Sequence, residues 1–194
     1  MFKKSDRPGF TLVETVISIA VISIITALFI ANYRSASRRS DIIMRAQEIV
    51  ADIHLAQNNA LGLVQYNNSV PPGGWGINFN RLENSYTIFA DLNAPGTSGY
   101  GSYDSSSEGN QNHGARTVVL PPLIKIFELK TADNATYDTL DVTFLPPDPK
   151  TNIWQGSGLG AATSTALEIT LTEEINNSTK TIRLNFLGLA EVLD

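Results

Sequence analysis

Residues Phe10 to Ala31 read FTLVETVISIAVISIITALFIA and carry a single charge, at Glu14. As an α-helix rising 1.5 Å per residue, this stretch would be roughly 33 Å long. That length matches the hydrocarbon core of a lipid bilayer, about 30 Å thick. We therefore predict a transmembrane helix over residues 10–31.

The residues before this stretch indicate its orientation. Lys3, Lys4 and Arg7 lie in a leader of nine residues, and basic residues beside a membrane span tend to remain in the cytoplasm. A secretory signal peptide is the alternative, but it would end in a small-residue cleavage site, and none follows Ala31. We expect a retained span with the remaining chain on the outer side.

The helical pattern continues beyond the span, because Pro and Gly are absent from residues 32–61 and Gly62 is the first stop signal. Arg45, Glu48 and Asp52 are expected to point away from the apolar stripe of this extension. The stripe recurs at steps of three and four and consists of Ile42, Ala46, Ile49, Ile53, Ala56 and Ala60. The pattern predicts one helix to Leu61; two helices with a bend near Asn32 are the alternative.

Short β-type runs separated by turn residues follow Gly62. The predicted strands are Trp75–Phe79, Tyr86–Ala90, Thr117–Leu120, Ile124–Leu129, Leu140–Leu145, Leu167–Leu171 and Thr181–Phe186. Two stretches, Asn93–Gly114 and Pro146–Ser164, are predicted to be exposed loops. The fold class is therefore α+β, with an antiparallel sheet packed on the helical stripe. The expected segments are a leader over 1–9, the span over 10–31, the helix extension over 32–62 and the β head over 63–194.

Composition excludes several kinds of site. The chain has no cysteine, so it can form neither disulfides nor thiolate metal sites. Its formal charge of −5 becomes about −7 without the leader, which disfavours generic nucleic-acid binding. Patterns typical of a serine hydrolase, a zinc protease or a P-loop are also absent. We expect no enzyme activity.

The motif Gly9-Phe10-Thr11-Leu12-Val13-Glu14, after Lys3 and Lys4, resembles the processing site of type IV prepilins and pseudopilins. The resemblance implies that prepilin peptidase cuts between Gly9 and Phe10 and that Phe10 is then N-methylated. It also implies that Glu14 neutralises the Phe10 amine of an adjacent subunit during assembly. A carboxylate inside an apolar span is costly, which favours such a role, although Glu14 could instead reach the membrane interface.

A weaker resemblance extends into the head. The segments Arg45–Leu61, Trp75–Asn93 and Lys180–Val192 are similar to H-type pseudopilins of type II secretion and to FimT-like minor pilins. The resemblance implies a pilin fold, with other pilin subunits and the inner-membrane assembly platform as partners. Many FimT-like proteins end in an arginine-rich segment associated with DNA binding, whereas here Gly188 is followed by Leu-Ala-Glu. This departure counts against DNA uptake.

Oxygen-bearing side chains surround the glycine-rich stretch after residue 90. Asp91, Asn93, Asp104 and Glu108 are of the type that binds calcium, although their spacing is not that of an EF-hand. Aspartate and asparagine are also common in ordinary turns. Calcium binding by Asp91, Asn93 and Asp104 is therefore a hypothesis beside a solvated loop.

Taken together, these features predict a structural subunit of a type IV pilus or type II secretion pseudopilus. It would be a single-pass protein of the bacterial inner membrane with an extracytoplasmic head. The rival is a signal-anchored binding or enzymatic domain for which the helix is only a tether. A tether would require neither Gly9 nor Glu14.

Overall fold

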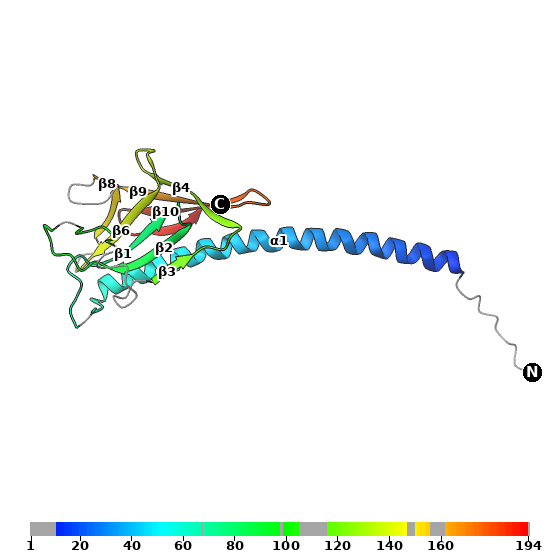
Figure 1. The fold of residues 1–194 in the computed structure, drawn as a ribbon, viewed down its shortest axis with the longest axis horizontal. Coiled ribbons are helices and arrows are strands. Elements are labelled where there is room, and N and C mark those ends of the chain that lie inside the picture. Colours follow the sequence, from blue (N-terminus) through cyan, green and yellow to red (C-terminus); the bar gives the residue numbers. More distant parts are fainter. Residues whose placement is uncertain are drawn as a thin grey trace, which may run out of the picture. The chain divides into compact units, whose positions relative to one another are not determined.

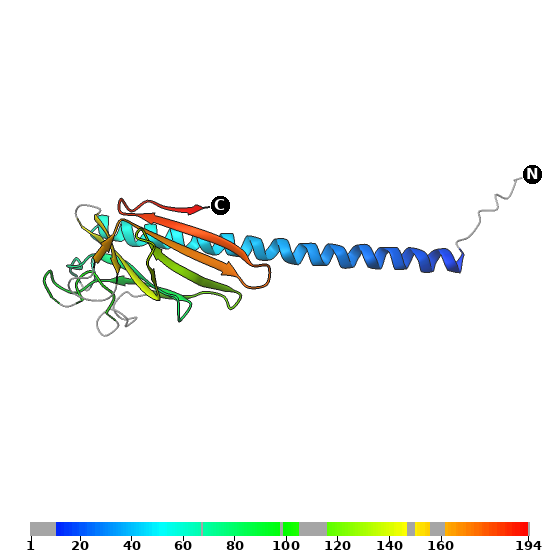
Figure 2. The same cartoon turned by 90° about the horizontal axis from the view of Figure 1, so that it is seen from above.

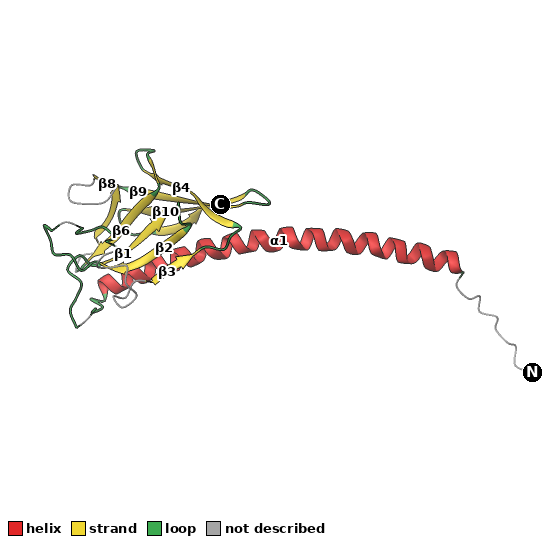
Figure 3. Ribbon diagram, in the orientation of Figure 1, coloured by secondary structure: helices red, strands yellow, loops and turns green. Residues whose placement is uncertain are grey.

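The computed structural model describes residues 11–66, 68–97, 99–104, 116–146, 150–155 and 162–193. Within them the chain forms one helix, α1 (Leu12–Leu61), and eleven strands, which confirms the α+β class (Figures 1 and 3). The helix is continuous over 50 residues, as expected. The chain divides into two compact units, residues 1–38 and residues 39–194.

The second unit buries one face of its part of α1. The buried apolar residues are those of the predicted stripe: Ile42, Ala46, Ile49, Ile53, Ala56 and Ala60. Their spacing alternates between three and four, so they lie on one side of a helix with 3.6 residues per turn. The prediction for this stripe is confirmed.

One antiparallel sheet has six strands in the order β3-β2-β1-β6-β7-β8. Its central hairpin is β1 (Trp75–Asn80) and β2 (Ser85–Ala90), with β3 (Arg116–Val119) outside β2. On the other side of β1 lie β6 (Thr139–Leu145), β7 (Lys150–Gln155) and β8 (Ala162–Ser164).

The other antiparallel sheet has five strands in the order β11-β10-β9-β4-β5. It contains β4 (Ile124–Thr131), β5 (Thr136–Tyr137), β9 (Ala166–Glu173), β10 (Ser178–Asn185) and β11 (Ala190–Leu193). The C-terminal strands β9, β10 and β11 lie side by side, coloured orange to red in Figure 2. A bulge in β4 between Ile126 and Glu128 shifts the alternation of inward-facing side chains, so that Leu129 is buried rather than Glu128.

Both sheets contribute alternate side chains to one core with the stripe of α1. In β9 the buried apolar residues are Leu167, Ile169 and Leu171, and in β1 they are Trp75, Ile77 and Phe79. The core residues all lie between Ile42 and Val192, inside the second unit. A fragment that begins at Arg34 would therefore keep the whole core.

Several predictions about the head need correction. The seven predicted strands are present, but they are divided between two sheets, and β5, β7, β8 and β11 were not predicted. The stretch Pro146–Ser164 is not simply an exposed loop, because it contains β7 and β8 and buries Thr151, Asn152 and Ile153. In Asn93–Gly114, Ser102 is also buried, whereas residues 105–115 lie outside the described part.

Candidate functional site

The first turn of α1 is capped by its own side chains. The hydroxyl of Thr11 accepts a hydrogen bond from the backbone N–H of Glu14 at 3.3 Å, and the N–H of Thr15 donates to the carbonyl of Thr11 at 3.2 Å. A threonine followed three residues later by a glutamate is the capping-box sequence, which satisfies free N–H groups at a helix start. Gly9 and Phe10, the predicted cleavage and methylation residues, lie outside the described residues.

The helix surface after this cap is apolar on every side. Residues 11–31 are all exposed within the protein, and the segment is long and apolar enough to cross a membrane. Its hydroxyl groups are satisfied locally: Ser18, Ser23 and Thr26 each donate at 2.8 Å to the carbonyl four residues earlier. The surface therefore presents few free polar groups to lipid or to another apolar helix.

Glu14 is the exception on this surface. Its side chain is the single charged group between Phe10 and Ala31, and it lies in the first helical turn. A carboxylate in that position is stabilised by the positive end of the helix dipole, typically by about 0.3–1 kcal/mol. In a medium of low dielectric it would still require a cationic partner.

A buried polar cluster links α1 to the six-stranded sheet within the second unit. Asp52 accepts a 2.7 Å hydrogen bond from the hydroxyl of Tyr86 on β2, and its other oxygen pairs with Arg116 on β3. Burial raises the pKa of Tyr86, and the hydrogen bond to Asp52 raises it further. The expectation that Asp52 points away from the packed face is therefore wrong, because two partners far along the chain compensate its burial.

The loop after β2 is organised by Asp91, which is fully buried. One carboxylate oxygen accepts the N–H of Asn93 at 2.9 Å, and the other accepts the N–H of Gly101 at 2.6 Å. Among the residues that the structure describes, no group of three or more His, Asp or Glu side chains could hold a metal ion. Calcium binding by Asp91, Asn93 and Asp104 stays a prediction, and Glu108 lies outside the described residues.

A second carboxylate holds a later residue of the same loop, Tyr103. Asp141 on β6 accepts the side-chain amide of Asn78 at 2.6 Å and the backbone N–H of Tyr103 at 3.1 Å. Burial raises the pKa of Asp141 to about 6, although these two hydrogen bonds favour the charged form. The loop is thus fastened to the sheet by Asp91 at one point and by Asp141 at another.

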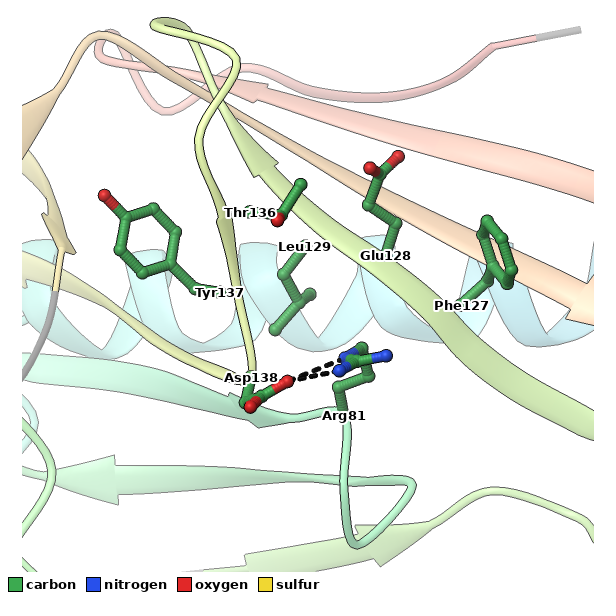
Figure 4. Close-up of a pocket in the computed structure, with 7 residues that line it drawn as sticks. All are labelled: Arg81, Phe127, Glu128, Leu129, Thr136, Tyr137 and Asp138. Carbon is green, nitrogen blue, oxygen red and sulfur yellow. Dashed lines mark hydrogen bonds and ion pairs between the residues drawn. The ribbon is translucent and has the colours of Figure 1, made fainter.

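A cavity of about 400 Å³ lies beside the β1–β2 turn and β5. Figure 4 shows Arg81 and Asp138 turned toward one another, with Phe127 and Tyr137 on either side of them. Arg81 donates from Nε to Asp138 at 3.0 Å, so these two opposite charges of the lining are paired with each other, and Glu128 is a further charged residue beside them. Among the described residues of this lining, no nucleophile is seen hydrogen-bonded to a base.

Sequence reasoning missed the roles of Thr11, Asp52 and Asp141. The threonine could have been identified, because T-x-x-E before an apolar run is a recognisable helix-start pattern. The two aspartates could not, since their partners Arg116 and Tyr103 are distant in the sequence.

Comparison with known protein families matches residues 4–30 to the prokaryotic N-terminal methylation motif. No curated protein and no solved structure was found to match the chain. The motif covers residues 4–9 of the basic leader, the Gly9-Phe10 bond, Glu14 and the apolar stretch as far as Ile30. It supports a type IV pilin-like prepilin with an N-terminal membrane anchor.

Proposed function

We propose that the chain is a non-enzymatic subunit of a type IV pilus or a type II secretion pseudopilus. Prepilin peptidase cleaves it between Gly9 and Phe10 and methylates the new amine, and it then assembles through its N-terminal helix. The observation that carries the proposal is the match of residues 4–30 to the methylation motif on a helix that is apolar on every side. A simple membrane tether would need no such motif.

Before assembly the subunit is a single-pass protein of the bacterial inner membrane, with residues 32–194 outside the cytoplasm. Lys3, Lys4 and Arg7 support this orientation, because a short basic leader stays on the cytoplasmic side. The partners are prepilin peptidase, other pilin or pseudopilin subunits, and the inner-membrane assembly platform. Among subtypes we favour an H-type pseudopilin or a FimT-like minor pilin, and the Leu-Ala-Glu sequence after Gly188, in place of an arginine-rich segment, disfavours DNA uptake.

In this proposal Glu14 supplies the charge that selects a neighbouring subunit. Two unit charges about 4 Å apart attract by roughly 4 kcal/mol at an effective dielectric of 20, but by only about 1 kcal/mol in water. The pairing of Glu14 with the Phe10 amine of a neighbour is therefore strongest where helices exclude water. Removing one partner leaves the other buried without compensation, which typically costs about 3–5 kcal/mol.

The test replaces Glu14 with glutamine. Glutamine can still complete the capping box with Thr11, so Glu14→Gln removes the charge and leaves the helix start intact. We expect normal membrane insertion and cleavage but a several-fold lower share of the variant in sheared filaments when it is co-expressed with wild type. The readout is quantitative mass spectrometry of membrane and filament fractions.

Two control variants distinguish the effect of the Glu14 charge on assembly from the effect of the helix cap. Thr11→Ala removes the cap but keeps the carboxylate, and Glu48→Gln removes a carboxylate from the same helix in the second unit. Both should enter filaments more efficiently than Glu14→Gln. Equal incorporation of Glu14→Gln and wild type would refute the assembly role of Glu14.

A further inference from the structure

The outer face of the six-stranded sheet carries two rows of polar side chains that run across the strands. The strand register places Thr117, Thr87, Asn78 and Asp141 in one row. The next row begins with Val119 at the edge strand β3 and continues with the polar residues Ser85, Asn80 and Thr139. These residues alternate with Ile77, Phe79, Tyr86 and Leu140 of the core, so they point away from it.

These rows form the floor of a groove of about 390 Å³, which Tyr103 and Glu83 also line. Its size falls within the roughly 300–1,000 Å³ typical of small-molecule sites. Ser85, Thr87 and Asp141 are only 4%, 6% and 6% exposed, although they lie on the outer side of the sheet. The groove is thus a recess that shields polar groups from solvent.

Hydrogen bonds within the protein hold the walls in place. Tyr103 is fixed by its N–H bond to Asp141, and its ring lies 5.4 Å from the ring of Phe89. At the other side the side chain of Asn80 accepts the N–H of Glu83 at 3.1 Å. A site whose groups are ordered before binding loses less entropy when a ligand enters.

The chemistry of the groove differs from that of the other outer face. Across the five-stranded sheet, one register row reads Lys130, Glu168, Arg183 and Glu191 and is fully charged. Among the residues that the structure describes, the groove is lined instead by hydroxyl and amide groups, two carboxylates, the ring of Tyr103 and Leu140, with no lysine or arginine. The hydroxyls of Thr87 and Thr117 lie 2.9 Å apart and share one hydrogen bond, in which either can be the donor. The O–H group of the accepting threonine can therefore still donate to a ligand.

We propose that this groove binds a neutral oligosaccharide. Sugar hydroxyls both donate and accept, as do threonine and asparagine side chains, and they can donate to the carboxylates of Asp141 and Glu83. The ring of Tyr103 offers an apolar surface for the C–H face of a sugar ring. Anionic ligands would be repelled by the two carboxylates, and an apolar peptide would find little apolar surface.

The site is separate from the N-terminal helix, and it gives the head a binding function in addition to assembly. The test uses the full-length protein in lipid nanodiscs that are free of sugar-headed detergents and glycolipids. Six-unit oligosaccharides of glucose, galactose, mannose and N-acetylglucosamine are the probes. Saturation-transfer difference NMR detects binding, and calorimetric titration measures the dissociation constant.

The informative variant is Thr87→Val/Thr117→Val, which removes both hydroxyls and preserves side-chain shape and strand propensity. Its matched control is Thr170→Val/Thr181→Val, because these two threonines also face each other in register, with hydroxyls 3.3 Å apart, on the other sheet. We expect at least one probe to bind saturably and the first variant to weaken that binding about tenfold or more, equivalent to about 1.4 kcal/mol. The control should bind as wild type does.

The proposal is overturned if none of the four oligosaccharides binds, or if the two double variants bind equally. Equal unfolding midpoints of the variants would show that any difference in binding does not arise from misfolding. Incorporation into filaments should be the same for both variants, so failure of the sugar site and failure of the assembly proposal can be distinguished.

Discussion

The hydroxyl of Tyr86 on β2 donates a 2.7 Å hydrogen bond to the carboxylate of Asp52 on α1, inside the second unit. Arg116 of β3 pairs with the other oxygen of that carboxylate. One helix side chain therefore fixes two neighbouring strands against α1. A buried charge of this kind depends on both partners, because its desolvation must be compensated.

Removing the Tyr86 hydroxyl should destabilise the head. Hydrogen bonds to charged groups contribute about 1.5–3 kcal/mol, so Tyr86→Phe should lower the free energy of unfolding by about that amount. Urea unfolding of a fragment over residues 34–194 measures it. Tyr137→Phe, at a half-buried ring, is the control and should change stability less. Equal effects of the two substitutions would show that the bond to Asp52 contributes little.

The helix stripe should tolerate no added volume. Ala46 is fully buried among the core residues, whereas Ala51 on the same helix is exposed. Ala46→Leu should cost about 1–3 kcal/mol through overpacking, and Ala51→Leu should stay within about 0.5 kcal/mol of wild type. Urea unfolding of the fragment over residues 34–194 measures both changes in stability. A tolerated leucine at position 46 would contradict the close packing of α1 on the sheets.

The head should become less stable as the pH rises from about 4 to 6. Burial raises the pKa of Asp141 from 3.8 to about 6, so in this window the folded protein holds a proton that the unfolded chain has released. The resulting loss of unfolding free energy approaches roughly 3 kcal/mol, because each unit of pKa difference between the folded and the unfolded chain corresponds to about 1.4 kcal/mol. Asp141→Asn should remove this part of the pH dependence. Identical pH profiles of the variant and wild type would exclude Asp141 as its source.

Asp91 should act mainly as a structural residue of its loop. Asp91→Asn turns one carboxylate oxygen into a donor, which cannot accept the N–H of Gly101 or Asn93, and should cost about 1–3 kcal/mol. We expect the loss to be the same in calcium and in a chelator. Calcium-dependent stabilisation of wild type that disappears in Asp91→Asn would instead establish the calcium site.

The parts of the fold that follow local periodicity could be predicted from the sequence. Apolar residues at steps of three and four are enough to predict the helix stripe from Ile42 to Ala60. The alternation of Leu167, Ile169 and Leu171 is likewise enough to predict β9. The strand β7 was missed because Pro146, Pro147 and Pro149 precede it and glycines follow it, which is typical of a loop. Its central residues became a strand through pairing with β6.

The polar contacts could not be predicted in the same way. The sequence pattern predicts Asp52 on the solvent side, because an acidic residue beside an apolar stripe usually points outward. Its partners Tyr86 and Arg116 are 34 and 64 residues away, and only the folded chain brings them together. The N-terminal motif is different, because Gly9, Phe10 and Glu14 are close in sequence, so their roles can be predicted without any tertiary information.

The proposed function requires that the chain is processed at Gly9-Phe10 before assembly. The most direct test is the intact mass and N-terminal sequence of the protein recovered from membranes and from sheared filaments. We expect a chain that begins at an N-methylated Phe10 and has lost residues 1–9. A chain that still begins at Met1, or one cut beyond Ala31, would contradict it.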